Sequence, residues 1–281
     1  MSLPHFFLEG QVLSQEAGEA FALRLSEGDL KHVRALRLVP GEHIAVIDAA
    51  QDYFECEIVE ATRDGVVARV AQHLDAPEEG AQVLLVQGIA KGEKMDDVVR
   101  HATEIGVAGI VPFASARSIV KLDARKAAAR AERWRAIAKS AAMQSGRRTI
   151  PEIAEVSGLS EVCELVRGAH AVLVCWEEAS AGNLREALSR ALAAQWIRDP
   201  RDARVAVVVG PEGGLEAREV EALMASNRFA ATISLGSTIL RTETAGLIAP
   251  ALALYELGGL GNESADEKTH AAREDREVSE R

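Results

Sequence analysis

Residues 207–220, VVVGPEGGLEAREV, run from an unbroken apolar segment through a glycine-rich turn into a charged pattern with helical spacing. A continuous apolar run is typical of a strand that is covered on both faces. Three glycines and a proline within residues 210–214 predict a sharp turn of bare backbone, whereas an ordinary strand-to-helix turn needs one glycine. The stretch therefore predicts a parallel α/β sheet and a loop that a flat ligand can approach closely.

The same alternation of strands and helices extends from residue 82 to about residue 258 and predicts one α/β domain with a parallel sheet. Further helices are expected to begin near Asn183, Leu215 and Thr242, with Thr242 as the N-cap of the last one. The expected buried strands are VLLVQGI, VAGIVPF, AVLVC, ARVAVVVG and ATISL, and the longest expected helices are EKMDDVVRHATEIG and AARAERWRAIAKSAAMQ.

Residues 1–75 have a different pattern. The short alternating runs GEHIAVIDA, YFECEIVEA and VVARVAQ predict a β-rich domain, either a small barrel or a sandwich. One helix is expected in DLKHVRALRL, capped by Asp29 and stopped by Pro40 and Gly41. Residues 76–81 are expected to be a linker. Residues 259–281 are expected to be a disordered tail, because Val278 is the only large apolar residue among the last 20.

Composition excludes several classes of protein. The chain has 281 residues, which favours about two domains at roughly 150 residues each. It contains no apolar run of about 18 residues and no signal-peptide pattern, so we expect a cytoplasmic protein without a membrane partner. The three cysteines, Cys56, Cys163 and Cys175, form no CxxC pair, and no histidine pair has metal-ligand spacing. We therefore expect neither a disulfide framework nor a metal site.

The distribution of charge is uneven. The formal net charge of −11 argues against nucleic acid as a partner. However, residues 115–150 hold ten Lys and Arg against two Asp and Glu, whereas residues 1–80 hold six against fifteen. A local basic region of this kind is either a phosphate-binding surface or the solvated face of an alanine-rich helix. Charge alone leaves both interpretations open.

A second unusual segment is SLGSTILRTETAGLIAPALALYEL, residues 234–257. It begins at the end of an expected strand and places Arg241 and Glu243 beside the start of a helix. Ligands of α/β proteins bind at the carboxyl ends of strands, so these two residues are candidates for a site, or else they form a surface ion pair with each other. The usual signatures GxGxxG, GxxxxGK[ST], HExxH and GxSxG are all missing.

The motifs GPEGGL and SLG..ILRTETA, in that order and about 20 residues apart, resemble the RsmE family of 16S ribosomal RNA uridine-N3 methyltransferases in the SPOUT superfamily. Residues 32–42, 88–107, 117–123 and 144–153 are similar to further segments of that family, so the resemblance covers residues 1 to about 258. It implies a PUA-like β-barrel domain over 1–75. It also implies a SPOUT methyltransferase domain over 82–258 with a C-terminal trefoil knot. Members often carry Glu where this chain has Met143.

The resemblance implies S-adenosylmethionine as the cofactor, 16S rRNA of the small ribosomal subunit as the substrate, and a homodimer. From the chemistry of that reaction, the candidate catalytic residues are Arg241, to stabilise negative charge on the uracil, Glu243, to orient Arg241, and Arg147 as a second basic group for either a phosphate or the base. The implied cofactor-binding residues are Gly210, Pro211, Glu212, Gly213, Leu235, Gly236, Ile239, Leu240, Thr242 and Ala245, with Ile239 and Leu240 as an apolar floor. The expected RNA-binding residues, most of them in the basic region of residues 115–150, are Arg34, Arg37, Arg117, Lys121, Arg130, Arg133, Arg147 and Arg148.

Two other functions compete with this interpretation. One is a related methyltransferase that acts on tRNA or on a ribose 2′-hydroxyl, and the other is an RNA-binding or assembly protein without catalysis. The β-rich first domain and the ILRTETA segment favour a methyltransferase for an rRNA base. The intact glycine loop argues against a purely RNA-binding role. The last helix, LIAPALALYEL, is apolar almost all round, which favours a dimer interface over burial within its own domain.

Overall fold

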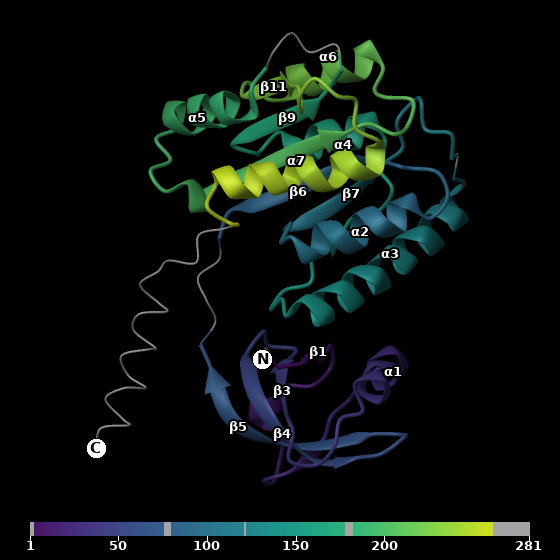
Figure 1. Ribbon diagram of the computed structural model, residues 1–281, viewed down its shortest axis with the longest axis vertical. Coiled ribbons are helices and arrows are strands. Elements are labelled where there is room, and N and C mark those ends of the chain that lie inside the picture. Colours follow the sequence, from purple (N-terminus) through teal and green to yellow (C-terminus); the bar gives the residue numbers. More distant parts are fainter. Residues whose placement is uncertain (1–2, 76–79, 121, 178–181, 261–281) are drawn as a thin grey trace. The chain divides into compact units, whose positions relative to one another are not determined.

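The computed structural model describes residues 3–75, 80–120, 122–177 and 182–260. These residues form two compact units, whose elements are labelled in Figure 1. One unit contains residues up to Glu78 together with Arg135–Pro151, and the other contains Glu79–Trp134 together with the chain from Glu152 onward. Most of the expected linker, and all but the first two residues of the expected tail, lie outside the described ranges.

The second unit is not the continuous segment that the sequence predicted. Helix α3 (Ala124–Ser145) changes unit after Trp134, so that its second half and the following residues belong to the first unit. The physical reason is hydrophobic: Ala142 and Met143 are buried in the core of the first unit, and Ile150 packs against it. Met143 is only 5% exposed and is therefore a core residue.

The first unit is built on a five-stranded mixed sheet in the order β1-β3-β4-β5-β2. β1 runs parallel to β3, and the other neighbours are antiparallel. No ladder joins β1 to β2 in the described part of the chain, so hydrogen bonds do not close the expected barrel. The elements are β1 (His5–Phe7), η1 (Leu13–Gln15), β2 (Phe21–Ala22), α1 (Glu27–Leu36), β3 (His43–Ile47), β4 (Tyr53–Ala61) and β5 (Val66–Leu74).

The start of α1 differs from the prediction. Ser26, not Asp29, is the N-cap: its hydroxyl accepts from the backbone N–H of Asp29 at 3.2 Å, while the Asp29 carboxylate accepts from the N–H of Ser26 at 3.0 Å. This reciprocal pair is a capping box, which satisfies two otherwise unpaired backbone donors. The helix ends at Leu36, ahead of Pro40, because Arg37 adopts a left-handed conformation with φ of 56°.

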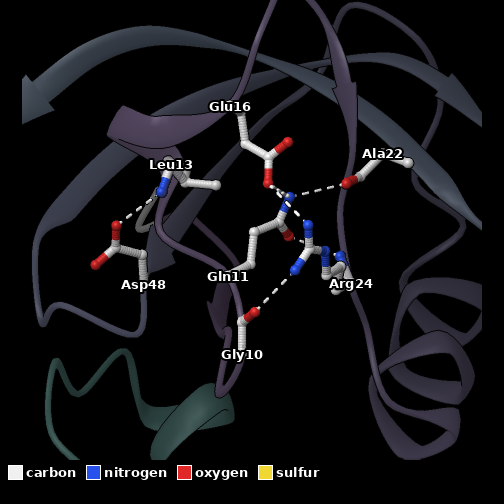
Figure 2. Close-up of polar contacts among 7 residues, drawn as sticks. All are labelled: Gly10, Gln11, Leu13, Glu16, Ala22, Arg24 and Asp48. Carbon is white, nitrogen blue, oxygen red and sulfur yellow. Dashed lines mark hydrogen bonds and ion pairs between the residues drawn. The ribbon is translucent and has the colours of Figure 1, made fainter.

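A buried glutamine fixes the irregular segment before β2 (Figure 2). The Gln11 side chain is 2% exposed; its amide donates to the carbonyl of Ala22 at 2.9 Å and to Glu16 at 3.0 Å. Its carbonyl oxygen accepts from the backbone N–H of Arg24 at 2.8 Å. A buried amide is costly unless it is hydrogen-bonded, so these contacts hold the segment in one conformation.

The second unit is a six-stranded sheet, and all of its strands are parallel, which confirms the predicted α/β class. The strand order is β11-β9-β10-β6-β7-β8, so β10 lies between β9 and β6. The strands are β6 (Gln82–Gly88), β7 (Gly109–Phe113), β8 (Glu152–Ile153), β9 (Ala171–Cys175), β10 (Arg204–Val209) and β11 (Ala230–Ile233).

Helices cover both faces of this sheet, as the unbroken apolar strands require. Helices α2 (Lys94–Glu104), α5 (Leu184–Ala194) and α7 (Thr242–Glu256) pack on one face, where α7 crosses β6 and β10 (Figure 1). Helices α4 (Leu159–Val166) and α6 (Ala217–Ser226) pack on the other, over a core that includes Val172, Val208 and Leu223. A short helix η2 (Pro200–Asp202) precedes β10. Within the described ranges, no helix is long and apolar enough to cross a membrane.

The end of β6 touches the glycine loop that follows β10. A Cβ atom placed on Gly88 would lie 2.4 Å from the backbone nitrogen of Pro211 and 2.8 Å from the carbonyl carbon of Gly210. Real Cβ atoms do not approach backbone so closely, so only glycine permits this contact. The loop after β10 is therefore seated directly on the end of the neighbouring strand.

This contact gives a stability prediction. Replacing Gly88 with Ala should destabilise the protein by roughly 1–3 kcal/mol, because overpacking forces the backbone of the glycine loop to move. The measurement is the midpoint and slope of urea unfolding. Gly168→Ala is the matched control, because no heavy atom lies within 4 Å of the added Cβ there. Equal stability of the two variants would show that the contact is not tight.

Candidate active site

A cleft of about 550 Å³ lies at the carboxyl ends of β9, β10 and β11 in the second unit. Its walls are the loop of residues 210–215, the loop of residues 234–241, and the first residues of α2 and α7. Ligands of parallel α/β sheets bind at this edge, and small-molecule sites typically enclose about 300–1,000 Å³. Position and size therefore identify this cleft as the candidate active site.

The floor of the cleft is apolar. It is formed by Val209, Leu215, Ile233 and Ala245, none of which is more than 8% exposed. The sequence analysis placed the floor at Ile239 and Leu240 instead. That expectation is wrong for Ile239, which is 87% exposed and lies on the rim.

The glycine loop has the bare backbone that its sequence predicted. Gly214 has φ of +70°, and its N–H donates to the carbonyl of Pro211 at 2.9 Å, which closes a tight turn. A Cβ on Gly210 would lie 2.9 Å from the carbonyl carbon of Gly214, so the two ends of the turn are in contact. Side chains at these positions would displace the loop.

Gly213 does not line the cleft, contrary to expectation. Its hydrogen atoms face Arg117 in the loop after β7: a Cβ there would lie 3.1 Å from the Cβ of Arg117. The Arg117 guanidinium donates to the carbonyl of Gly213 at 3.1 Å. Gly214 occupies the cleft wall in its place, and Gly213 instead allows the two loops to pack together.

The start of α7 is fixed by a chain of two hydrogen bonds. The Thr242 hydroxyl donates to the carbonyl of Gly210 at 2.6 Å and accepts from the Gln87 side-chain amide at 2.9 Å. Gln87 is fully buried and Thr242 is 6% exposed. Thr242 was expected to be the N-cap, but Arg241 occupies that position and the threonine hydroxyl holds the glycine loop instead.

Three charged side chains from three segments meet beside the cleft. The Lys94 ammonium lies 3.4 Å from Glu212 in the glycine loop and 3.1 Å from Glu243 in the first turn of α7. The Glu212 carboxylate also accepts from the backbone N–H of Lys91 at 3.0 Å. Glu243 therefore pairs with Lys94, and the expected pairing of Glu243 with Arg241 is wrong.

These contacts shift two pKa values in opposite directions. The hydrogen bond with Glu243, followed by that with Glu212, raises the pKa of Lys94. For Glu212, burial acts to raise the pKa, but hydrogen bonds from its own backbone N–H, from the backbone of Lys91 and from Lys94 outweigh it and lower the pKa. The charged form of Lys94 stabilises the folded protein fully below the ordinary lysine pKa, and this stabilisation is lost only as the pH rises through the raised pKa of Lys94. The charged form of Glu212 stabilises the folded protein above the ordinary carboxyl pKa, and this stabilisation is lost as the pH falls through the lowered pKa of Glu212.

Arg241 lines the cleft and is exposed. In the described part of the chain, no carboxylate lies within ion-pair distance of its guanidinium. The planar cation is thus available to a bound ligand.

Several lining residues were not predicted from the sequence, among them four that lie outside the two predicted loops. Lys94 begins α2, and Cys175, Trp176 and Glu177 follow one another at the end of β9. Burial raises the pKa of Cys175 to about 12, so its thiol is protonated and unreactive at neutral pH. The position of Cys175, Trp176 and Glu177 in the sequence could have revealed them, because residues at the end of a buried parallel strand reach the ligand-binding edge of the sheet.

The expected RNA-binding residues are divided between the two units. Arg117, Arg130 and Arg133 belong to the second unit, and Lys121 lies outside the described residues. The rest belong to the first unit: Arg34, Arg37, Arg147 and Arg148. Arg147, the second catalytic candidate, is half-buried, and desolvation lowers its pKa.

Arg133 and Arg148, like Arg117, have structural partners. The Arg133 guanidinium donates to the buried Asp96 carboxylate at 2.6 and 2.9 Å, and the Trp134 indole N–H donates to it at 3.1 Å. Arg148 lies over the ring of Tyr53, 4.2 Å from its centre. Charge counting could not distinguish these residues from exposed cations such as Arg34.

The all-parallel sheet and the cleft at its carboxyl edge define a SPOUT-type RNA methyltransferase domain, and residues 77–254 match the RNA methyltransferase domain family. The ribosomal RNA small subunit methyltransferase E of Bacillus subtilis is 33% identical over 258 residues, which cover 90% of this chain and 97% of that protein. The enzyme of the same name from Mycobacterium tuberculosis is 33% identical over 217 residues, covering 76% and 78%. This chain belongs to the ribosomal RNA small subunit methyltransferase E (RsmE) family, as the resemblance predicted.

Solved structures agree with this assignment. Ribosomal RNA small subunit methyltransferase E of Neisseria gonorrhoeae, bound to S-adenosyl methionine, matches with a TM-score of 0.71 at 26% identity and covers 91% of this chain and 98% of its own. A Legionella pneumophila protein, solved in complex with the bound cofactor SAM, matches with a TM-score of 0.75 at 26% identity and the same coverages.

The Thr242 hydroxyl yields a second prediction. Thr242→Val keeps the shape of the side chain but removes the partner of the Gly210 carbonyl and of one Gln87 amide N–H, while the amide keeps its bond to the Gly88 carbonyl, so it should cost about 1–3 kcal/mol of unfolding free energy. Thr244→Val, at an exposed position in the same helical turn, should change stability by less than about 0.5 kcal/mol. Urea unfolding measures both; a Thr242 variant as stable as the Thr244 variant would contradict the role given to this hydroxyl.

Proposed function

We propose that the cleft binds S-adenosylmethionine and that the protein methylates N3 of a uridine in 16S rRNA of the small ribosomal subunit. The observation that carries the proposal is the bare-backbone cleft at the carboxyl edge of the sheet in a chain of this family. Two relatives with the same fold were solved with this cofactor. We also infer that the protein works in the cytoplasm, where small subunits are assembled.

The residues present fit this cofactor. The buried floor suits an adenine ring, and the half-buried backbone at Gly210 and Gly214 lines the cleft without side chains, so the ring can approach it closely. Charged groups stand on the rim for the polar parts of the molecule. Of the expected contacts, those that line the cleft are Gly210, Pro211, Glu212, Leu235, Gly236, Ile239, Leu240, Thr242 and Ala245.

The C-terminal trefoil knot belongs to this proposal as well. Its support is the route of the chain: residues 234–241 leave the edge strand β11, and α7 then lies across β6 and β10, against the glycine loop.

The chemistry gives Arg241 its role. When bound, S-adenosylmethionine supplies a methyl group activated by a sulfonium. Uridine N3 carries a weakly acidic proton, which must pass to solvent water for N3 to bond to the methyl carbon, while the bond from that carbon to sulfur breaks and leaves a thioether. As the proton leaves, negative charge spreads onto the two flanking carbonyl oxygens. A planar guanidinium with several donors matches that distribution of charge, and Arg241 lies on the cleft wall without a carboxylate partner in the described chain.

RNA contacts are proposed at exposed or half-buried cations of each unit. In the first unit these are Arg34 and Arg37, and in the second unit Arg117 and Arg130 are the matching candidates. Each neutralises a phosphate charge in this proposal, so binding to small subunits should weaken as salt rises.

Nucleoside mass spectrometry of 16S rRNA tests the function directly. The rRNA of a strain that lacks the gene should have no N3-methyluridine, and a plasmid copy of the gene should restore it. The same nucleoside content with and without the gene would contradict the substrate and position proposed.

Arg241→Ala tests the catalytic assignment. If the guanidinium acts mainly in the transition state, kcat should fall by about 10²–10³ while cofactor affinity changes by less than roughly twofold. Arg241→Lys should recover only part of the rate, because an ammonium offers a point charge in place of a fork. Methylation kinetics and calorimetry measure the two quantities.

The control for this variant is Arg190→Ala, which removes an exposed arginine from α5. It should leave both kcat and affinity unchanged. A near wild-type rate for Arg241→Ala would end the catalytic assignment, and parallel losses of rate and affinity would make Arg241 a binding residue only.

We further infer a homodimer that buries the outer face of α7. Ile248, Leu252 and Tyr255 are 37%, 42% and 59% exposed, and their spacing places them on one side of this helix. The opposite side, which includes Ala249 and Ala253, is fully buried in its own unit. A row of exposed large apolar side chains is typical of a protein interface.

Leu252→Glu tests the dimer, since a charge on this row should convert the dimer to monomer at micromolar concentration. Light scattering coupled to gel filtration gives the mass. Leu165→Glu on α4, at a position 50% exposed, is the control and should leave the mass unchanged. A monomeric wild-type protein, or a Leu252→Glu variant with the wild-type mass, would contradict the proposed interface.

A further inference from the structure

Lys94 occupies a position that helix electrostatics disfavours. It is the first residue of α2, where the helix dipole stabilises negative rather than positive side chains. The two following acidic residues of the first turn, Asp96 and Asp97, obey that rule. A cation at this end of a helix therefore needs partners elsewhere, and Lys94 has them in two other segments.

Those partners depend on Lys94 in turn. Glu212 and Glu243 lie 3.4 and 3.1 Å from the same ammonium nitrogen, so the two carboxylates are close neighbours, and their side chains are only 24% and 25% exposed. Like charges that are partly withdrawn from water repel more strongly than on an open surface. Without Lys94, the glycine loop and the start of α7 would be driven apart at this point.

The segments joined in this way form three walls of the cleft: the start of α2, the glycine loop and the first turn of α7. We propose that Lys94 is a positioning residue that clamps Glu212 to Glu243 and so sets the cleft geometry that the cofactor requires. This inference rests on the proposed function, because it assumes that the ligand of the cleft is S-adenosylmethionine. Lys94 acts through the two carboxylates and not on the reacting atoms.

Two ligands that differ in net charge can show whether Lys94 acts as a clamp or only through the electrostatic effect of its own charge. S-adenosylmethionine has a net charge of +1 at neutral pH, because of its sulfonium, whereas the product S-adenosylhomocysteine is neutral overall. Removing a cation from the cleft would strengthen binding of the charged ligand if Lys94 acted only through its charge. A clamp predicts the opposite: both ligands bind more weakly and by similar factors.

The experiment is calorimetric titration of wild type, Lys94→Met, Lys94→Arg and Lys91→Met with each ligand. Lys94→Met should weaken both ligands about tenfold, and Lys94→Arg should stay within about threefold of wild type, because it keeps the ion pairs. Lys91 is the matched control: it is exposed in the loop that leads into α2, and it reaches Glu212 through its backbone N–H. Lys91→Met should bind both ligands as wild type does.

The double variant Lys94→Met with Glu243→Gln adds an internal check. It removes the repulsion that the first change creates, so it should recover part of the lost affinity, whereas a Lys94 needed only for packing would give no recovery. Urea unfolding of each variant verifies the fold, and Lys94→Arg carries the test if Lys94→Met is unstable.

The possible outcomes separate the two proposals. Wild-type affinity in Lys94→Met, tighter binding of S-adenosylmethionine alone, or no recovery in the double variant would overturn the clamp while leaving the proposed function in place. Failure of the wild-type protein to bind either ligand would overturn the proposed function, and the clamp with it.

Discussion

The architecture of the site depends on the two hydrogen bonds that the Thr242 hydroxyl forms. This hydroxyl links the buried amide of Gln87, at the end of β6, to the carbonyl of Gly210, at the end of β10. Gln87 and Thr242 are 155 positions apart in the chain, and both are almost completely buried. In a low-dielectric interior a donor or acceptor without its partner is costly, so this chain of hydrogen bonds fixes the start of α7 against the glycine loop.

Other features of the cleft follow from that constraint. The glycine loop lies so close to β6 that Gly88 has no room for a Cβ atom, and Gly210 has none because the turn closes on itself at Gly214. The ion pairs of Lys94 then join the same loop and helix on the solvent side. The cleft is thus held by buried hydrogen bonds beneath and by charge at the rim. Its apolar floor comes from side chains at the ends of strands, such as Val209 and Ile233.

Much of the fold was predictable from local pattern. Unbroken apolar runs such as AVLVC predict strands buried on both faces, and the parallel six-stranded sheet confirms this. The two unusual loops, at residues 210–214 and 234–241, could be assigned to the cleft because they follow strands and contain bare backbone or charge. The expected cofactor and substrate were inferred from the motifs GPEGGL and SLG..ILRTETA.

Local pattern failed where a side chain has its partner in a distant segment. Threonine often caps helices, but the Thr242 hydroxyl forms its hydrogen bonds with Gln87, at the end of β6, and with Gly210, after β10. Glu243 is next but one to Arg241, yet its carboxylate pairs with Lys94. The presence of three glycines among five residues does not show which of them line the cleft, and Gly213 packs against Arg117 instead.

Counts of charged residues did not predict which cations are free to contact RNA, for the same reason. A segment net charge does not show that Arg133 is committed to the buried Asp96, or that α3 passes from one unit to the other after Trp134. Both facts depend on tertiary packing, which has no signal in the spacing of charges along one helix.

Amide hydrogen exchange with and without S-adenosylmethionine is the most direct test of the central claim, that one cleft made by the glycine loop and the segment before α7 holds the cofactor. The account predicts slower exchange on cofactor addition in residues 210–215 and 234–242, and unchanged exchange near Gly168 at the opposite end of the strands. Protection confined to other segments, or no protection at saturating cofactor, would contradict it.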